Sequence, residues 1–441
     1  MSSLNATVFA LDYGLPLLSF AKLAIPFVSF GAVNYFVHLT QLATPQETTV
    51  VLPNVDTIYS AADVIVTIPP IDKDHYWSFA FYDPFGNNFA NPSSVDNSLA
   101  GNYLLRYTRS HEWGLQPAGV SNSSLYQGYI NSPTTDGVLL GRILVKNNTT
   151  DLLYVQSLVS ASSLTTVPSN RTAASSLTKE NLAPYQSSNN TAQVVLQLLA
   201  NFAHTNPPFN ISEKTEKFAE KALSIAGARN GRYQQPSNTD LSAAYNLALG
   251  SIQSQVPRFT ETFNNGWTHN VPQGLYGNNY KDRAAVAEVG YLELTDDQAL
   301  YPMRESGTMQ LNANESYLFT FSRKPPVQND GFWSLTLYNS EGYLVSNDLN
   351  RYAVGDRSTL TYPDATPVYG NGSAAAGNET FQVLIQPAAV TPPSNWTNNW
   401  LPSPANFSSF STTLRFYAPK SELANGSYQF PLVSKQSAFI A

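Results

Sequence analysis

The chain is 441 residues long, with a net charge of −7, only 12% charged residues and no cysteine. The missing cysteines exclude disulfide bonds, thiolate metal sites and a thiol nucleophile. Because Lys and Arg form no runs and the overall charge is negative, nucleic acid and anionic membranes are poor partners, and we expect a neutral one. A chain of this length has room for two or three domains with a sizeable core.

The low content of charged residues is typical of a surface covered by neutral polar side chains or by glycans. Asn-x-Ser/Thr acceptor sequences recur along the chain and favour a glycosylated protein, extracellular or in the secretory pathway. The apolar stretch 15–36 lacks a basic start and is interrupted by Pro, Lys and Gly, so it predicts neither a signal peptide nor a membrane-spanning helix. We expect the numbering to begin after a secretion signal. Four acceptor sites in polar surroundings are predicted to be modified, namely Asn148, Asn371, Asn378 and Asn425.

The first part of the chain predicts a short helical segment followed by mainly β structure. Apolar residues first recur at helical spacing, and then β-branched and aromatic residues dominate. A later stretch rich in Ser, Thr, Asn and Pro is typical of a linker. The predicted segments are helix over 7–42, a strand and turn over 50–60, β structure over 61–158 ending with strands 138–145 and 152–158, and a linker over 159–190.

The pattern then changes to apolar residues at 3.6-residue spacing, which predicts helices. From residue 301 onward, strand-like runs separated by Pro and Gly return. The predicted helices cover 192–203, 213–226, 240–256 and 281–289.

Two segments of the chain match each other without a gap, residues 69–91 and 325–347. Both carry a double Pro and the same Asp, Trp, Ser, Tyr, Gly and Asn positions. Agreement at so many unusual positions favours duplication over convergence of two ordinary hairpins. Trp77 and Trp333 are equivalent in this repeat, so we expect both in the core. In the second copy we expect a hairpin, with one strand over 332–338 and the other over 343–346.

These patterns predict an α+β protein that is mainly β, with two duplicated β-sandwiches and an inserted helical layer. The expected domains are an N-terminal helical and β-sandwich domain over 1–170, a helical segment over 171–298, and a C-terminal β-sandwich over 299–441.

Several motifs occur in a characteristic order, and through them the chain resembles a known family. The motifs are Asn54-x-Asp56-Thr57-x-Tyr59-Ser60, Tyr276-Gly277-x-Asn279-Tyr280-x-x-Arg283-Ala284, Phe332-Trp-Ser-Leu-Thr-Leu-Tyr338, Asn347-x-x-x-Arg351-Tyr352 and Asn399-Trp-Leu-Pro402. The chain is similar, over 10–431, to the bacterial and fungal family built from two paired domains of unknown function, catalogued as twelve-fifty-four and twelve-fourteen. The resemblance implies two jelly-roll-like β domains with inserted helices, similar in shape to large viral capsid proteins. It implies no established reaction.

Motifs for cofactor chemistry are missing from the sequence. The five histidines are scattered, without the spacing that a zinc or iron site needs. No phosphate-binding loop, dinucleotide fingerprint or Gly-x-Ser-x-Gly elbow is present. We therefore expect no metal and no organic cofactor, which leaves acid–base chemistry.

Asp56 is the main candidate for proton transfer. It lies between Asn54 and Tyr59 in what reads as a turn after an apolar strand. Partial burial there would raise its pKa towards values useful to a general base. The alternative is that Asp56 caps the turn through backbone N–H groups.

The second candidate cluster follows the repeat, where Asn347, Arg351 and Tyr352 occur together. Arg351 could hold an oxyanion or a carboxylate through two parallel hydrogen bonds. An inter-domain salt bridge to Asp56 or Asp83 is the alternative.

Three further candidates come from the helical segment and the end of the chain. Tyr280 and Arg283 lie at i and i+3 at the start of a helix, so they point the same way, although Arg283 could equally clamp the helix end. His269, in a polar and aromatic loop, is either an acid–base residue or a solvated histidine. Trp400, beside polar Asn residues, is suited to stacking on a sugar or an aromatic ring.

We expect these polar clusters to meet where the domains meet, because isolated polar groups are costly to bury. Asp56, Tyr59, Arg351 and His269 would act in catalysis, while Asn54, Tyr280, Arg283, Asn347, Tyr352 and Trp400 would bind substrate. The sequence thus predicts a cofactor-independent enzyme acting on a neutral glycan or aromatic molecule, of hydrolase, lyase or isomerase type. The alternatives are a non-catalytic carbohydrate-binding or ligand-binding protein and a self-assembling, capsid-like protein, and a homo-oligomer fits either type.

Overall fold

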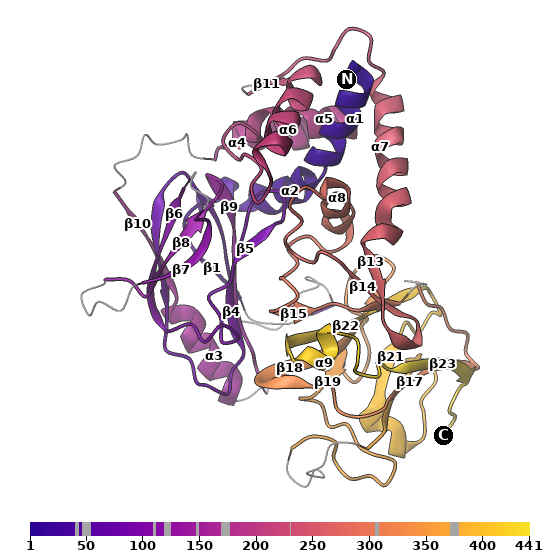
Figure 1. Ribbon diagram of the computed structural model, residues 1–441. Helices are drawn as coiled ribbons and strands as arrows, with labels where there is room; N and C mark the ends of the chain where they lie inside the picture. Colours follow the sequence, from indigo (N-terminus) through magenta and orange to yellow (C-terminus); the bar gives the residue numbers. More distant parts are fainter. Residues whose placement is uncertain are drawn as a thin grey trace.

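The computed structural model describes residues 1–39, 44–45, 54–108, 112–118, 125–146, 150–168, 177–229, 231–304, 308–370 and 379–441. Figure 1 shows an N-terminal and a C-terminal β unit beside each other, with most helices gathered at one end of the molecule. The α+β class predicted from the sequence is confirmed.

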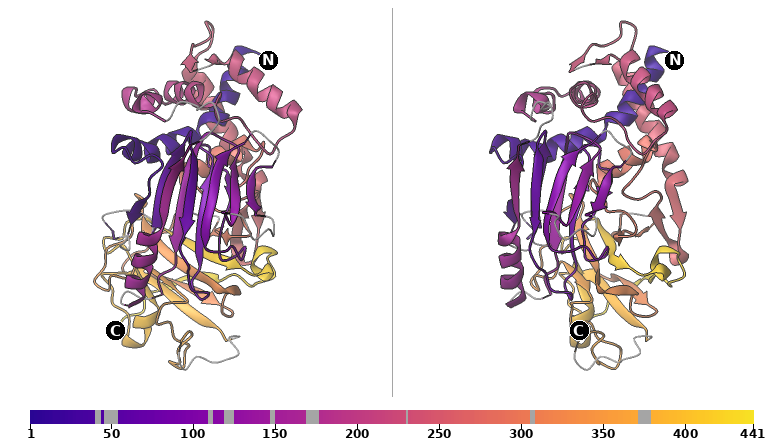
Figure 2. Two further views of the ribbon diagram at one scale, coloured as in Figure 1. Left: turned by 90° about the vertical axis from the view of Figure 1, so that its left-hand side faces the viewer. Right: turned by 60° about the vertical axis from the view of Figure 1, so that its left-hand side comes forward.

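The N-terminal β unit consists of two five-stranded sheets. Residues along β4 (Trp77–Tyr82) alternate between two hydrophobic clusters, because successive side chains of a strand point to opposite faces. The strand orders are β1 (Val37–Leu39), β2 (Asn54–Ser60), β9 (Asp136–Ile143), β4 and β5 (Asn88–Ala90) in one sheet, and β10 (Ser163–Val167), β3 (Asp63–Ile68), β6 (Gly101–Tyr107), β8 (Gly128–Ser132) and β7 (Gly114–Pro117) in the other. Figure 2 shows these strands stacked beneath the helices.

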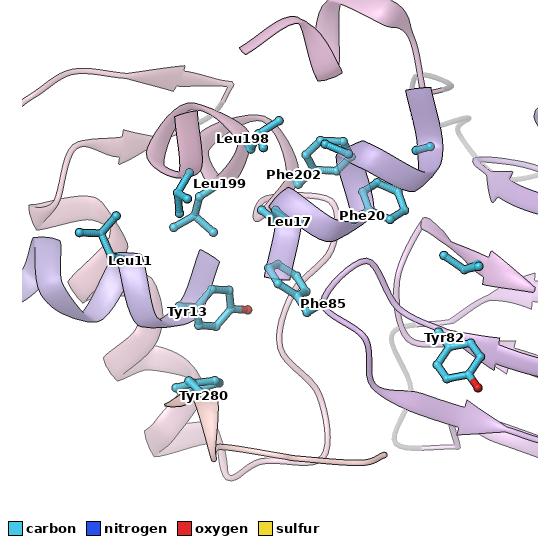
Figure 3. Close-up of a cluster of buried hydrophobic side chains, with 14 of the residues drawn as sticks. Leu11, Tyr13, Leu17, Phe20, Tyr82, Phe85, Leu198, Leu199, Phe202 and Tyr280 are labelled. Atoms are coloured by element: carbon cyan, nitrogen blue, oxygen red, sulfur yellow. The ribbon is translucent and has the colours of Figure 1, made fainter. Parts of the chain in front are cut away.

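The helical layer is assembled from the start and the middle of the chain. Figure 3 shows Leu11 and Leu17 of the first two helices packed against Leu199 of α5. Gly14 permits this approach, since a Cβ there would lie 3.0 Å from the Val195 side chain. The helices are α1 (Ser3–Gly14), α2 (Pro16–Ser29), α4 (Lys179–Ser187), α5 (Thr191–Phe202), α6 (Glu213–Ile225), α7 (Leu241–Gln255) and α8 (Tyr280–Val289). The first two helices thus pack with the helical segment, although their residues precede the first β unit.

The C-terminal β unit also has two sheets. Their strand orders are β15 (Ala299–Leu300), β22 (Phe410–Pro419), β18 (Val327–Asn339) and β19 (Ala353–Gly355), and β21 (Trp400–Ser403), β20 (Phe381–Pro387), β17 (Glu315–Phe321) and β23 (Leu432–Ser437). Smaller elements connect or cover the units, namely α3 (Thr150–Ala161), α9 (Ser421–Ala424), β11 (Ala228–Arg229), β12 (Arg232–Tyr233), β13 (Thr260–Thr262), β14 (Trp267–Asn270), β16 (Met303–Arg304) and the 3-10 turns Val256–Phe259, Asn264–Gly266 and Ser394–Asn399.

Four local predictions were wrong. The helix expected over 7–42 ends at Ser29, and Val37–Leu39 forms strand β1. The strand expected over 152–158 is part of helix α3, whose buried Val155, Leu158 and Val159 have helical spacing. The stretch 159–190 is no simple linker, since it contains β10 and α4. The second strand of the 332–346 hairpin is reduced to one bridge, between Tyr338 and Leu344. β18 pairs instead with β19 and β22, which supply longer ladders.

No single helix in the described ranges is long and apolar enough to cross a membrane, although α1 and α2, bent by 44°, reach that length and composition as a pair.

Three carboxyl groups are enclosed in or beside the helical layer. Burial raises the pKa of Asp12 to about 7 against the lowering effect of Lys281. Burial likewise raises the pKa of Asp282 and of Glu293 to about 7. A carboxyl whose pKa is higher in the folded state stabilises the protein below its unfolded-state pKa, and this stabilisation is lost as pH rises through the folded-state pKa.

We therefore predict that the melting temperature falls by several degrees between pH 4.5 and pH 8, as measured by calorimetry. Asp12→Asn should raise it at pH 8 but change it little at pH 4.5, because the asparagine carries no charge to desolvate. The exposed Glu220 provides a control, since Glu220→Gln should change it little at either pH. A melting temperature that rises with pH would contradict this prediction.

Candidate functional site between the two β units

The outer face of the sheet β1-β2-β9-β4-β5 carries polar residues beside apolar ones that belong to the same cluster as the helices. In its register Ser78 lies opposite Arg142, and Asp56 lies opposite Leu140, which itself lies opposite Ala80. Period-two alternation places Tyr82 on this face too, while Trp77, Phe79 and Phe81 point into the sandwich. The strand pairing thus brings a carboxylate, a guanidinium and two hydroxyls to one face.

A second polar face comes from the sheet β15-β22-β18-β19. Here Ser334 lies opposite Arg415, and Phe332 lies opposite Tyr417. Thr336 and Tyr338 follow on the same face, whereas Trp333, Leu335 and Phe416 belong to the C-terminal core.

Aromatic contacts join the two faces. The Tyr76 ring lies 5.4 Å from the ring of Phe332 and 5.3 Å from that of Tyr417, measured between centroids. Phe332 and Tyr417 are stacked at 4.3 Å, and Tyr301 approaches Tyr417 edge-on at 6.3 Å. The region formed by both faces is called the interdomain layer, and consists of Asp56, Tyr76, Ser78, Tyr82, Arg142, Tyr301, Phe332, Ser334, Thr336, Tyr338, Arg415 and Tyr417.

Burial perturbs the one carboxyl group among these residues. Burial raises the pKa of Asp56 to about 7, although the nearby positive charge of Arg142 acts to lower it. Arg142 also acts on Tyr82, Tyr301 and Tyr417. At this pKa Asp56 exchanges protons close to neutral pH, as a general acid or base requires.

Four hydroxyl groups in the interdomain layer lack partners. Among the described residues, the hydroxyls of Tyr76, Ser78, Tyr82 and Thr336 make no hydrogen bond of acceptable geometry, although Tyr76 lies close to Ser78 and Tyr82 lies close to Arg142. These side chains are at most 1% exposed. Leaving a buried hydroxyl unpaired costs roughly 1–3 kcal/mol. The neighbouring Asp56, Arg142, Tyr301 and Arg415 are nevertheless partly exposed, so solvent reaches the layer.

The first predicted cluster is divided between the two faces of one sheet. Asp56 lies within strand β2 and not in a turn, so the predicted turn was wrong. Tyr59 points to the sandwich interior, where its hydroxyl donates to the Tyr82 carbonyl at 3.2 Å and lies 3.1 Å from Ser132 Oγ. Asn54 is in the same strand, but its side chain lies outside the described residues. Tyr59 is thus a structural residue of the sandwich core.

The second predicted cluster is a local clamp in the C-terminal β unit. The Asn347 side chain accepts the Arg351 N–H at 3.1 Å, and the Arg351 guanidinium donates to the carbonyls of Thr397 and Trp400. Tyr352 donates to Asn350 at 3.1 Å. Because these carbonyls occupy the guanidinium, Arg351 holds the segment before β21 and forms neither of the interdomain salt bridges considered from the sequence.

Trp400 is not an open stacking platform. It is 6% exposed, packs with Leu318 and Leu384, and donates through Nε1 to the Gln386 carbonyl at 3.1 Å. The predicted role in stacking on a ligand is therefore wrong, because the indole ring is already packed.

Tyr280 and Arg283 lie on α8 as predicted, within an aromatic cage. The Arg283 guanidinium lies 4.6 Å from the Phe85 ring and 4.8 Å from the Tyr13 ring, and Nη2 donates to the Tyr13 carbonyl at 2.7 Å. Figure 3 shows Tyr280 beside Tyr13, while the Tyr82 hydroxyl points away from the helices. Arg283 therefore ties α8 to α1 away from the interdomain layer.

His269 is neither in a loop nor solvated. It lies in β14, is 5% exposed and stacks on Phe263 at 4.3 Å. Its Nε2 is 3.4 Å from a Glu261 oxygen. These contacts give His269 a packing role and leave Asp56 as the one predicted catalytic residue in the interdomain layer.

A separate groove of about 980 Å³ runs between α5, α6 and the N-terminal β unit. Its lining includes Tyr13, Trp113, His204, Phe209 and Glu216, but none of Asp56, His269 and Arg351. The perturbed carboxyl and the unpaired hydroxyls lie elsewhere, so we place the candidate site in the interdomain layer. Over the described residues, no three His, Asp or Glu side chains gather as metal ligands would.

Two family descriptions match the chain. Protein of unknown function (DUF1254) covers residues 33–166, and Protein of unknown function (DUF1214) covers residues 298–421. The chain has the paired DUF1254–DUF1214 architecture. The family resemblance seen in the motifs is confirmed, and the interdomain layer lies between the two matched regions.

A solved structure shares the fold of this DUF1254–DUF1214 protein at low sequence identity. The VPA0106 protein from Vibrio parahaemolyticus is 17% identical, with a TM-score of 0.62 over 98% of this chain and 99% of its own. A putative uncharacterized protein from Burkholderia cenocepacia is 11% identical, with a TM-score of 0.44 over 99% of this chain and 94% of its own. No curated protein matches the chain significantly.

Sequence reasoning missed the two arginines of the interdomain layer. Arg142 and Arg415 lie outside the internal repeat and belong to no motif; only strand pairing brings them opposite Ser78 and Ser334. Period-two alternation within the repeat does place Tyr82 with Ser78 and Tyr338 with Ser334. That signal could have revealed both polar faces of the DUF1254–DUF1214 protein.

We predict that Thr336→Val leaves the melting temperature unchanged or raises it, because it removes a buried hydroxyl without a partner and keeps the side-chain shape. Ser60→Ala is the contrasting variant. Its buried hydroxyl donates to Asp136 at 2.7 Å and accepts from the Leu177 N–H at 2.8 Å, so its loss should cost roughly 1–3 kcal/mol in urea denaturation. Equal destabilisation by both variants would show that Thr336 has a partner.

Proposed function

We propose that this protein is a cofactor-independent enzyme that transfers protons on a small organic substrate, a glycan or an aromatic molecule, bound in the interdomain layer. One observation carries the proposal. Asp56, with a pKa of about 7, shares a sheet face with Arg142, Tyr82 and the unpaired Ser78 hydroxyl. Perturbed carboxyls of this kind concentrate at functional sites.

The chemistry follows from the charges of these groups. Ionised Asp56 would accept a proton from the substrate or from a water molecule. Arg142 would stabilise the negative charge that develops, and the hydroxyls of Ser78 and Tyr82 would donate hydrogen bonds to the same oxygen. Reactions of hydrolase, lyase or isomerase type fit this set of groups.

We also make a proposal about the form and the origin of the two β units. We infer that the two β units are jelly-roll-like and arose by duplication. Trp77 in β4 and Trp333 in β18 support this, since each points into the core of its own unit, and Ser78 and Ser334 each lie opposite an arginine.

We also propose that the protein is extracellular and glycosylated. Asn425 is exposed, at the turn that follows α9. Asn148, Asn371 and Asn378 lie outside the described residues.

The test of the enzyme proposal is Asp56→Asn, assayed on the substrate that screening of glycans and aromatic metabolites identifies. Its kcat/KM should fall roughly 10²- to 10⁴-fold, as for loss of a general acid–base group. The unchanged protein should gain activity as pH rises through about 7, because Asp56 must be ionised to accept a proton.

Stability separates this loss of activity from misfolding. The asparagine side chain of the variant would carry no charge to desolvate, so Asp56→Asn should melt no lower than the unchanged protein at pH 8. A folded Asp56→Asn protein with full activity would refute the proposal. Retained ligand binding without any turnover in the unchanged protein would favour a binding protein instead.

For glycosylation, we predict that protein secreted from a eukaryotic host loses mass after glycosidase treatment, as measured by mass spectrometry. Asn425→Gln should reduce this loss by one glycan, because Asn425 is accessible to the transferase. An unchanged mass after treatment would refute the modification.

A further inference from the structure

The two arginines of the interdomain layer occupy equivalent positions on opposing faces. Arg142 lies across a strand pair from Ser78, and Arg415 lies across a strand pair from Ser334. Both act on the same two aromatic hydroxyls, those of Tyr301 and Tyr417, which places both charges at one region.

The positive charge of this region is only partly compensated. Among the described residues, neither Arg142 nor Arg415 forms an ion pair with a carboxylate. A third arginine, Arg357, lies over the Phe332 ring at 4.5 Å, but it is already balanced by Asp356 at 3.9 Å. Two guanidinium groups and the Asp56 carboxyl group thus belong to the layer, and the Glu293 carboxyl group also acts on Tyr82.

The remaining groups of the layer are hydrogen-bond donors and aromatic rings. Among the described residues, the buried hydroxyls of Tyr76, Ser78 and Thr336 make no hydrogen bond of acceptable geometry, and each can donate to an acceptor. The rings of Phe332 and Tyr417 stack on each other and contact Tyr76, so they close this side of the layer and leave no open face for a further ring.

We propose that the interdomain layer binds a carboxylate, which Arg142 and Arg415 would hold. A carboxylate only accepts hydrogen bonds, so it matches a lining of guanidinium and hydroxyl donors. Both arginines are partly exposed, so an anion can reach them. This inference rests on the site of the proposed function, and it replaces the neutral partner expected from the overall charge with an anion.

The binding test uses benzoate, 4-hydroxybenzoate and cinnamate, each compared with its neutral amide, by isothermal titration calorimetry. At least one carboxylate should bind ten or more times as tightly as its amide. Arg415→Met should weaken that binding at least tenfold and remove the preference over the amide. Arg415→Lys keeps the charge but lacks the two-pronged geometry, and should retain part of the affinity.

Arg258→Met is the matched control, because Arg258 is exposed and the variant has the same change in net charge. It should bind the carboxylate as the unchanged protein does. Circular dichroism and the melting temperature establish that each variant is folded, and Thr336→Val provides a second, milder change in the same layer, with weaker binding expected. Equal affinity for acid and amide, no binding of any of the acids, or binding unaffected in both folded Arg415 variants would each overturn the inference.

The inference and the proposed function fail separately. Activity on a neutral substrate that is lost in Asp56→Asn, without any preference for carboxylates, would refute the inference alone. Carboxylate binding that depends on Arg415, in a protein whose activity does not depend on Asp56, would refute the role of Asp56 alone.

Discussion

The contact of Tyr76 with Phe332 and Tyr417 joins two β units that otherwise have separate cores. Each of the two contacting sheets has one face in its own core, so its other face must pack against something else. In a single sandwich that other face would meet solvent and would be polar for that reason. Here parts of two such faces pack on each other, which buries their hydroxyls but leaves Asp56, Arg142 and Arg415 partly exposed.

This arrangement concentrates functional groups without any binding motif in the sequence. The packing of each core holds the strands in place. The strands in turn set the backbone positions of the interdomain layer residues, so only their side-chain rotamers can vary. Because Ser78 and Arg142 come from paired strands, their separation depends on a ladder of backbone hydrogen bonds and not on a loop. Sites on rigid elements of this kind keep their geometry when a ligand binds.

The helical layer was easier to predict from the sequence than the interdomain layer. The helices α5, α6, α7 and α8 were predicted nearly to the residue, because each has apolar residues at helical spacing. In the structure Ser212 caps the start of α6 and Asp240 that of α7. Such local signals need no knowledge of the fold. In α3 the same spacing was overlooked, since its apolar residues follow a long β-rich stretch.

The candidate site was predictable only in part, for a physical reason. Asp56 was singled out from its local sequence, but its partner Arg142 is determined by the pairing of β2 with β9 and of β9 with β4. Arg351 and Trp400 looked like ligand-binding residues because polar and aromatic types lie together there. In the structure, the Arg351 guanidinium and the Trp400 indole N–H both donate to backbone carbonyls. A sequence shows which groups are present, whereas long-range pairing decides which of them remain available.

The position of α1 and α2 affects how the chain is made. A ribosome synthesises these two helices before the N-terminal β unit, but their partners α5 to α8 emerge only after it. At usual rates of translation this delay is on the order of ten seconds. During that interval Leu11, Leu17 and Phe20 lack the cover that α5 to α8 give them, so this part of the protein depends on chaperones or on its own collapse to avoid aggregation.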